Sequence, residues 1–508
     1  MDRPDKQFWL DAMNQEYQSL IENDTWELCK LPSTHKAIKN KWVFCTKRDE
    51  QGNIIKYKAR LVIKGCSQKY GIDYQEVFAP VVRYSSIRYL MGLAVKFDLD
   101  IDQMDAVTAF LQGELNGEEL YMMQPIGFSN NTNQVCRLKR ALYGLKQSSR
   151  VWNRKLDEEL KKYGLQQSQL DPCIYFTYQD GNVLIVTVYV DDLLIFSNNK
   201  QIKSHFRNYL LSTFKMKDLG EVQNCLGFKI TRDRKNGKLY LSQKQYIIDI
   251  LEKYNMKNSK PISTPMDPNV KYDQSMCPQT EGERMEMARI PYREAIGSLL
   301  YVAQISRPDI YYAVHVLSQY NSNPGKEHWK GIKRIFRYLN GTIDLKLVYC
   351  QDPSGNVIGY SDADWAGCIN TRRSTSGYIF MFQGAPISWS SKKQQSVALS
   401  SCEAEYVALS NATQEAMWWY NLQKEIDEEM PIEMNVDNQS AINLASNNSY
   451  STRTKHIDIR FHFVKEVVAD NKIEIQYCPT EKQAADILTK PIGSVKMTQN
   501  YKLLSMSN

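Results

Sequence analysis

The segment Tyr189-Val190-Asp191-Asp192 places two adjacent carboxylates inside the apolar stretch Val183–Phe196. Burying two like charges side by side costs desolvation and repulsion unless a positive charge compensates them. A hairpin turn here would present both carboxylates to a divalent cation, which prefers oxygen ligands. The alternative is an ordinary solvated Asp-Asp turn, but the flanking Tyr189 and Leu193 bring no glycine or asparagine to form one. The pattern therefore favours a metal-binding turn.

A second acidic segment, DLDIDQMDAVTAFLQGEL, contains Asp98, Asp100, Asp102 and Asp105. All four are candidate metal ligands by chemistry, and periodicity does not choose among them. Asp105 follows a strand-like run and precedes AVTAFLQG, which is typical of a strand that turns into a helix. A carboxylate at such a junction can ligate a metal while the next backbone groups approach a phosphate.

Four more acids stand in separate predicted elements: Asp362 in GYSDADWAG, Glu405 in SSCEAEYVAL, Asp437 in EMNVDNQSAI and Asp486 in QAADILTK. Each one alone is more typical of a solvated surface. Together they could hold Mg²⁺ if the fold gathers them, because hard cations prefer carboxylate oxygens. Glu403 lies two residues before Glu405, so on a helix only one of the two would point into a cleft.

The positive charge of the chain is concentrated in one segment. The 508 residues carry a net charge of only +7, yet residues 41–70 hold eight basic residues against Asp49 and Glu50. This segment alternates as a β-hairpin around a turn at Gly52-Asn53. Its basic strip is either a solvated β surface that resists aggregation or a strip that binds phosphates.

Cysteine and histidine usage excludes several classes of site. The eleven cysteines are scattered without a Cys-x-x-Cys pair, and none of the six histidines stands at zinc-ligand spacing from a cysteine. A disulfide framework and a structural zinc site are therefore not expected. The start MDRPDKQFWL lacks the pattern of a secretory signal, and Val183–Phe196 is too short to span a bilayer. We expect a reducing, aqueous compartment and no membrane partner.

The length and composition predict several soluble domains. Hydrophobic residues make up 43% of the chain and charged residues 24%, which is typical of globular proteins. Helical periodicity is expected over 8–20, 148–163 and 292–339, and the proline-rich stretch 256–290 is expected to be loop or linker. A fresh α/β pattern runs from Val357 to about Pro491. We divide the chain into 1–255, a linker and helical connector over 256–350, an α/β domain over 351–495 and a C-terminal tail over 496–508.

Eleven motifs stand in a recognisable order: WVFCTKRDEQGNIIKYKARLVIKG, QMDAVTAFLQGEL, LYGLKQSSRVWN, YVDDLLIF, LGFKI, GSLLYVAQISRPDI, SDADWAG, SSCEAEYVAL, VDNQSAI, TKHIDIRFHFVKE and QAADILTK. From about Trp26 to Pro491 the chain resembles the reverse transcriptase–ribonuclease H segment of a copia-type long-terminal-repeat retrotransposon Pol polyprotein. The resemblance implies an α/β (α+β) fold. A right-hand fingers–palm polymerase domain with an antiparallel palm sheet (1–255) would lead through a helical thumb or connection to a ribonuclease H-like mixed-sheet domain.

The resemblance also implies roles for single residues. Asp105 and Asp191 match the palm carboxylates that hold two Mg²⁺ ions, and Asp192 matches a supporting acid of that site. The other matched positions are Lys58 and Arg60 for the incoming triphosphate, Phe110 as the steric gate against a 2′-hydroxyl, Gly144 in the loop beside the nucleotide, Leu226, Gly227 and Phe228 as the primer grip, and Lys217 as a proton donor to pyrophosphate.

In the second domain, Asp362, Glu405, Asp437 and Asp486 match the four metal-binding carboxylates of ribonuclease H, which would hold two Mg²⁺ ions. Many cellular ribonucleases H carry a histidine shortly before the last acid, and YCPTEKQAAD has none. Thr480 or Glu481 cannot simply take over its proton-shuttling role, which puts the hydrolytic rate in doubt. His456 and His462 fit structural positions or nucleic-acid contacts better than catalysis.

The implied function is DNA synthesis on an RNA or DNA template, coupled to cleavage of the RNA in RNA–DNA hybrids. The implied partners are an RNA template, a DNA primer, dNTPs and other products of the same polyprotein. The implied setting is DNA recombination and integration in virus-like particles of the cytoplasm, or in the nucleus. One alternative is a catalytically silent relic of an element that only binds nucleic acid. Another is a nuclease whose polymerase domain serves only to clamp the hybrid.

Overall fold

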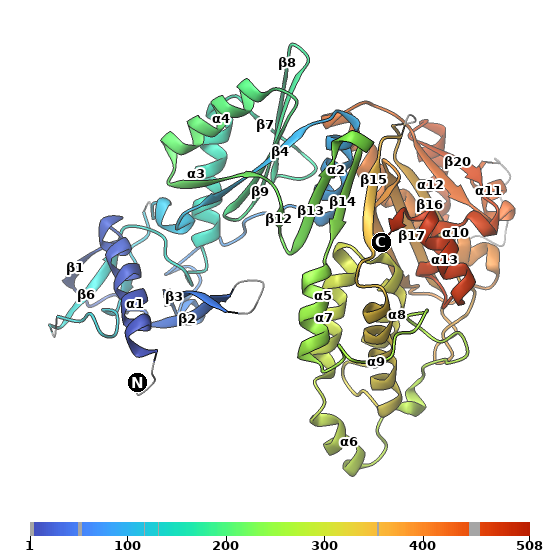
Figure 1. Ribbon diagram of the computed structural model, residues 1–508, viewed down its shortest axis with the longest axis horizontal. Helices are drawn as coiled ribbons and strands as arrows, with labels where there is room; N and C mark the ends of the chain where they lie inside the picture. Colours follow the sequence, from blue (N-terminus) through green and yellow to red (C-terminus); the bar gives the residue numbers. More distant parts are fainter. Residues whose placement is uncertain are drawn as a thin grey trace. The chain divides into compact units, whose positions relative to one another are not determined.

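The computed structural model describes residues 5–48, 53–115, 117–130, 132–352, 355–446 and 458–507. The chain divides into two compact units (Figure 1). Unit 1 comprises Met1–Val82 and Ile101–Gly220, and unit 2 comprises Arg83–Asp100 and Glu221–Asn508. Unit 2 thus contains one short segment, Arg83–Asp100, that interrupts unit 1 in the sequence, and everything after Gly220.

The largest sheet of unit 1 is the palm sheet, with strand order β11-β4-β10-β9-β8-β7. Its strands are β4 (Asp100–Ala106), β7 (Gln166–Gln167), β8 (Ile174–Gln179), β9 (Asn182–Tyr189), β10 (Asp192–Ser197) and β11 (Met216–Glu221). Strands β7 to β10 pair antiparallel. Helices α3 (Ser148–Lys162) and α4 (Lys200–Thr213) pack on the sheet through a buried core that includes Trp152, Leu193 and Phe206. The expected antiparallel palm is confirmed.

The rest of unit 1 is built around the basic hairpin. Strands β2 (Asn40–Arg48) and β3 (Ile54–Ile63) pair antiparallel, as the sequence predicts, while Gly52 of the expected turn lies outside the described residues. Helix α1 (Lys6–Glu22) packs against β3. A separate sheet joins β1 (Trp26–Lys30), β6 (Gln134–Leu138) and β5 (Tyr121–Met122).

Unit 2 begins with α2 (Tyr84–Lys96) and later contains a set of connector helices. The connector helices are α5 (Lys244–Lys253), α6 (Glu281–Ala288), α7 (Tyr292–Ile305), α8 (Tyr311–Ser318) and α9 (Lys326–Gly341). Their apolar faces share one core that includes Leu299, Val314 and Phe336. The helical connector predicted over 292–339 is therefore present.

Helix α6 corrects the expectation of loop throughout 256–290. Thr280 accepts a hydrogen bond from the backbone N–H of Glu283, whose carboxylate in turn accepts from the backbone N–H of Thr280. This reciprocal capping box stabilises a helix start even though α6 buries only Met287. The Thr-x-x-Glu spacing was the available signal, and the surrounding prolines obscured it.

A five-stranded sheet of unit 2 combines segments from the middle and the end of the chain. Its order is β12 (Asn224–Cys225), β13 (Phe228–Asp233), β14 (Lys238–Ser242), β15 (Lys346–Cys350) and β21 (Met506–Ser507). The residues that we expected to form a C-terminal tail form β21 and most of helix α13 (Ser494–Leu503). Strand β21 pairs with β15, and Met506 is buried.

The second sheet of unit 2 is mixed, with the order β18-β17-β16-β19-β20. Its strands are β16 (Ile358–Ala363), β17 (Thr375–Phe382), β18 (Ala385–Lys393), β19 (Ile432–Val436) and β20 (Ile473–Tyr477). The first three pair antiparallel, and β16, β19 and β20 pair parallel. Helices α10 (Ser401–Ile426), α11 (Gln439–Ser446) and α12 (Asp458–Ala469) accompany it. This is the ribonuclease H-like mixed sheet that the resemblance implies.

Across the described ranges, none of the helices combines the length and the apolar character that a membrane crossing requires.

Candidate active sites

The turn between β9 and β10 carries the first pair of acids. Tyr189 pairs with Asp192, so Val190 and Asp191 form a two-residue turn. Val190 has a φ of +58°, a conformation that a β-branched residue rarely adopts and that costs about 1–3 kcal/mol. The carbonyl oxygen of Val190 accepts a hydrogen bond of 2.7 Å from the Trp152 indole N–H on α3. The turn is therefore strained, and the helix behind the sheet holds it in place.

The neighbouring strand β4 brings a third acid to this turn. The backbone N–H of Ala106 donates to the Asp191 carbonyl oxygen at 2.8 Å. Burial raises the pKa of Asp191, and the negative charge of Asp105 raises it further. Burial likewise raises the pKa of Asp192, with Asp191 and Asp105 adding to the effect. The structure thus brings Asp105, Asp191 and Asp192 together as mutually repelling, half-buried acids.

The packing of β4 also distinguishes Asp105 from Asp102. Asp102 is buried and binds the Lys203 ammonium and the Arg207 guanidinium, each at 3.0 Å. Alternate residues of a strand face opposite sides of the sheet, so Asp102 shares the face of Met104, which packs in the core with the helices. Asp105 lies on the other face. Its carboxylate is therefore the one available to the Asp191 turn.

Asp98 and Asp100 form ion pairs with arginines away from the Asp191 turn. Both bind the guanidinium of Arg234, and Asp98 also binds that of Arg232 at 3.0 Å. These ion pairs lie in unit 2. Of the four acids that the sequence left open, Asp105 alone stands beside the Asp191 turn.

The basic residues of β3 act electrostatically on the same turn. The positive charges of Arg60 and Lys58 lower the pKa of Asp191, against the larger effect of burial. The Arg60 guanidinium also lies 5.0 Å from the centre of the Tyr143 ring. The ring of Phe110 lies 4.7 Å from that of Tyr143, centre to centre. Arg60, one of the two predicted triphosphate residues, and Phe110, the predicted steric gate, thus both contact the ring of Tyr143.

Gly144 holds the loop after Tyr143 against β3. The backbone N–H of Ile63 donates to the Tyr143 carbonyl oxygen at 2.8 Å. Gly144 has a φ of +93°, and a Cβ there would lie 2.1 Å from the Ile63 carbonyl oxygen. No other residue fits without displacing the strand that carries Arg60.

The predicted primer grip lies in unit 2, at the turn between β12 and β13. Leu226 and Gly227 have φ values of +49° and +82°, and Phe228 begins β13. The Tyr301 hydroxyl donates to the Leu226 carbonyl oxygen at 3.0 Å. The tight turn is present. Its nucleic-acid role, like that of the exposed Lys217 on β11, stays a prediction.

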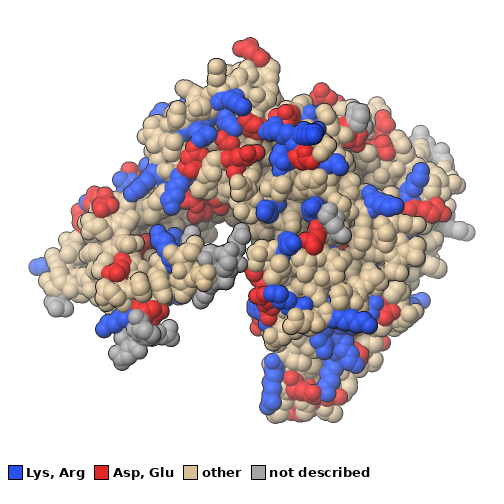
Figure 2. Space-filling view, in the orientation of Figure 1, with Lys and Arg blue, Asp and Glu red and all other residues tan. Residues whose placement is uncertain are grey.

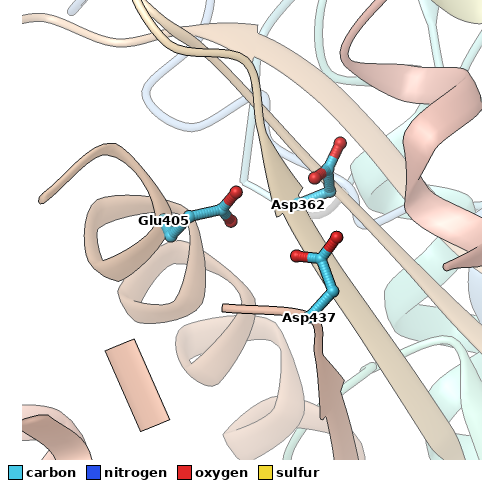
Figure 3. A group of neighbouring side chains, drawn as sticks. All are labelled: Asp362, Glu405 and Asp437. Carbon is cyan, nitrogen blue, oxygen red and sulfur yellow. The ribbon is translucent and has the colours of Figure 1, made fainter. Parts of the chain in front are cut away.

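A second acidic site lies in the mixed sheet of unit 2 (Figure 3). Asp362 stands on β16, Glu405 on the first turns of α10, and Asp437 directly after β19. One carboxylate oxygen of each residue lies within 4.8 Å of the others. A strand, a helix and a neighbouring strand end therefore direct three carboxylates toward one space, as Figure 3 shows.

The electrostatics of these three carboxylates fit a divalent cation. Burial raises the pKa of Asp362 to about 7, although the nearby Lys490 opposes the shift. Burial, Asp362 and Asp437 raise the pKa of Glu405 to about 9. Oxygen Oε2 of Glu405 is buried without a hydrogen-bond partner. An orphaned buried carboxylate oxygen within an all-oxygen donor set is what a hard cation would satisfy.

Nearby hydroxyl groups orient two of the acids. Thr480 donates to Asp437 Oδ2 at 2.9 Å, and Thr489 donates to Asp362 Oδ2. Glu403 instead accepts from the backbone N–H of Leu399 at 2.8 Å, before the start of α10. The expectation that only one of the two glutamates points into the site is confirmed.

Asp486 is not among the three carboxylates whose oxygens lie within 4.8 Å of one another, although its charge also raises the pKa of Asp362. It is fully buried on the 3-10 segment Ala484–Leu488, and its carboxylate binds Lys490 at 2.7 Å and Lys496. Sequence reasoning missed both lysines. The i, i+4 spacing of Asp486 and Lys490 was a usable signal, whereas Lys496 follows the predicted domain. His462 is exposed on α12, and His456 lies outside the described residues.

Basic side chains do not form a single positive patch on the face shown in Figure 2. Lysine and arginine side chains are interspersed there with aspartate and glutamate side chains. The local placement of basic residues beside the acids, rather than the total charge, therefore matters for the two sites.

Comparisons with known proteins agree with this architecture. Residues 23–268 match the family described as reverse transcriptase (RNA-dependent DNA polymerase). The chain is 43% identical over its whole length to the retrovirus-related Pol polyprotein from transposon TNT 1-94 of Nicotiana tabacum, of which it covers 38%. It is 38% identical over 97% of its length to that from transposon RE1 of Arabidopsis thaliana, of which it covers 33%.

A solved structure shares the fold. It is that of a foamy viral protease-reverse transcriptase in complex with double-stranded DNA, and it matches 92% of this chain and 69% of its own at 14% identity, with a TM-score of 0.50. The chain spans about a third of the length of the two transposon polyproteins. From the family match and these identities, the chain belongs to the reverse transcriptase family of copia-type retrotransposon Pol polyproteins.

Proposed function

We propose that this chain is an RNA-directed DNA polymerase that extends a DNA primer on an RNA or DNA template and also cleaves the RNA strand of RNA–DNA hybrids. The observation that carries the proposal is the presence of two separate carboxylate sites, one in each unit. Each gathers acids that lie far apart in the sequence and that repel one another without a cation. Such costly arrangements persist where they serve a function.

In the polymerase site, Asp105 and Asp191 would hold Mg²⁺, with Asp192 in support. Bound Mg²⁺ would favour ionisation of a primer 3′-hydroxyl and offset the charge of a triphosphate. Arg60 and Lys58 lower the pKa of Asp191 and so already act at the turn, where they would bind the triphosphate of an incoming dNTP. The Phe110 ring would exclude nucleotides with a 2′-hydroxyl.

In the ribonuclease site, Asp362, Glu405 and Asp437 would hold the divalent cation. Thr480 and Thr489 keep two of these carboxylates oriented. The substrate would be the RNA strand of a hybrid, distinguished from DNA by its 2′-hydroxyl groups. The transposon relatives are Pol polyproteins of which this chain spans about a third, so other products of such a polyprotein are further candidate partners.

Primer extension tests the polymerase half of the proposal. Purified chain with Mg²⁺, a primed poly(rA) template and dTTP should extend the primer, and Asp105→Asn should abolish extension. Asp98→Asn is a matched control, because this acid of the same segment binds arginines of unit 2 and should leave extension intact. Extension that survives Asp105→Asn would remove the site assignment.

Salt-dependent filter binding, measured on the same preparation, distinguishes an active polymerase from a silent relic that only binds nucleic acid. Tight binding of primed template without extension by the unmodified chain would favour a relic that only binds nucleic acid. Cleavage of a hybrid without extension would instead favour a nuclease.

A further inference from the structure

Two lysines form ion pairs with Asp486, the fourth carboxylate of the predicted ribonuclease site. The buried carboxylate of Asp486 binds the Lys490 ammonium at 2.7 Å through one oxygen and the Lys496 ammonium through the other. The Lys490 ammonium also lies 3.8 Å from Asp362 Oδ2. Each oxygen of Asp486 therefore faces an ammonium group of the protein, although Oδ1 is in ion-pair contact with Lys490 without a well-aligned hydrogen bond.

We propose that the ammonium groups of Lys490 and Lys496 take the place of a second divalent cation at this centre. The centre then binds a single ion through Asp362, Glu405 and Asp437, and Asp486 serves to hold the lysines rather than the metal. This inference rests on the proposed ribonuclease function and specifies the cation that it uses. Lys490 and Lys496 are positioning residues, because they act through the carboxylates.

Charge balance supports one ion rather than two. When all are ionised, the four acids carry four negative charges, and the two ammonium groups cancel two of them. One divalent cation neutralises the remainder. A second cation would have to enter a site that is already balanced, beside two fixed positive charges, and like charges at such distances repel strongly in a buried setting.

Lys496 lies on helix α13, whose packing holds the lysine in contact with Asp486. Helix α13 packs through the buried residues Met497 and Asn500, and the Asn500 side chain donates to the Lys496 carbonyl oxygen at 2.9 Å. At the next turn the Tyr501 and Tyr338 hydroxyl groups hydrogen-bond at 2.6 Å. The C-terminal helix is thereby fixed against α9, which positions Lys496 over Asp486.

The exposure of the two lysines makes their substitution a suitable test of whether a second cation can then bind. Their side chains are 40% and 32% exposed, whereas that of Asp486 is 0% exposed. Replacing the ammonium groups with apolar side chains of similar length leaves a buried carboxylate that must take up either a cation from solvent or a proton. The titrations are therefore made at about pH 8, where free Mn²⁺ competes well with protons.

The test counts Mn²⁺ ions bound to the whole chain by calorimetric titration and by the electron paramagnetic resonance signal of free Mn²⁺. Asp105→Asn and Asp191→Asn are present in every sample to remove the polymerase site. This background should bind one ion, and Lys490→Met with Lys496→Met should bind two. Lys502→Met, an exposed lysine on the same helix, is the matched control and should still bind one.

The outcomes separate this inference from the proposed function. Two ions in the background chain would overturn the proposal that the lysines replace a second cation, and so would one ion in a double methionine variant with native circular dichroism. Either result would leave the ribonuclease centre itself in place. No ion in the background would remove the centre itself.

A milder pair of variants covers the case in which the double variant does not fold. Lys496→Gln removes one of the two ammonium charges, so a second Mn²⁺ should bind to this variant at concentrations at which the background chain binds one. Lys496→Arg, which keeps the charge, should leave the count at one. Equal titrations for glutamine and arginine would contradict the proposal.

Discussion

The Trp152 indole N–H donates to the Val190 carbonyl oxygen at 2.7 Å, which ties the helix behind the palm sheet to the turn that carries Asp191. Val190 pays a conformational cost at φ +58°. The turn therefore depends on a contact from an element more than thirty residues earlier in the chain.

Trp152→Phe should lower the rate of primer extension by about tenfold, because the partly buried Val190 carbonyl loses its donor and the acids shift slightly. Steady-state extension kinetics would measure it. Trp389→Phe is the matched control, since the Trp389 indole N–H donates to the Ala303 carbonyl oxygen in unit 2. Equal losses of extension in the two variants would point to general destabilisation.

Gly144→Ala should destabilise the chain more than Gly164→Ala. Both glycines have positive φ, +93° and +106°, so both variants carry a strain of about 1–3 kcal/mol. Only at Gly144 would the Cβ meet the Ile63 carbonyl oxygen, whereas nothing lies within 4 Å at Gly164. We expect an additional cost of about 1–3 kcal/mol from overpacking, measured by urea denaturation.

The same substitution should also raise the apparent KM for dNTP, because the clash displaces the strand that carries Arg60. A Gly144→Ala variant with the stability and KM of Gly164→Ala would show that the loop yields without moving β3.

Phe110→Ala should relax the selection of dNTPs over rNTPs. The ring packs against Tyr143 and is held in one place, so removing it opens space where a 2′-hydroxyl could fit. We expect discrimination to fall by about tenfold or more, measured as the ratio of kcat/KM for dTTP and UTP. Tyr143→Phe keeps the ring contact and should preserve the ratio. An unchanged ratio in Phe110→Ala would assign the gate elsewhere.

Without a divalent cation, the stability of the chain should fall as the pH rises from about 5 to about 9. Burial raises the pKa of Asp362 to about 7 and that of Glu405 to about 9, so the folded chain holds these protons more tightly than the unfolded chain. The loss begins above the ordinary carboxyl pKa of about 4 and is complete above the folded values.

Mg²⁺ should oppose that loss, so it should raise the Tm more at about pH 8 than at about pH 6, as measured by differential scanning fluorimetry. Glu405→Gln should flatten the pH dependence in the absence of the ion. A Tm that rises with pH in the metal-free chain would contradict the electrostatic description of the site.

Local patterns predicted the features that depend on neighbouring residues. Alternation and basic charge predicted the β2–β3 hairpin, and two acids within an apolar run predicted the turn at Asp191. The resemblance added the assignment of Asp105. The structure supports it, because three arginines and one lysine form ion pairs with Asp98, Asp100 and Asp102.

Long-range packing was beyond local patterns. Helix α2 belongs to unit 2 because the buried Arg88 donates to the carbonyl oxygens of Ile387 and Ile305, some two to three hundred residues away. Burial lowers the pKa of Arg88 to about 10. Likewise, nothing near Asp486 in the sequence shows that Lys496 of a supposed tail binds it. Such contacts follow from the tertiary fold alone.

The most direct test of two separate centres is a paired assay of Asp191→Asn and Asp362→Asn. Each purified variant is tested for primer extension and for cleavage of the RNA strand in an RNA–DNA hybrid, at equal occupancy of nucleic acid. We predict that Asp191→Asn loses extension and keeps cleavage, and that Asp362→Asn does the reverse. Retention of both activities by either variant would contradict the assignment of its centre.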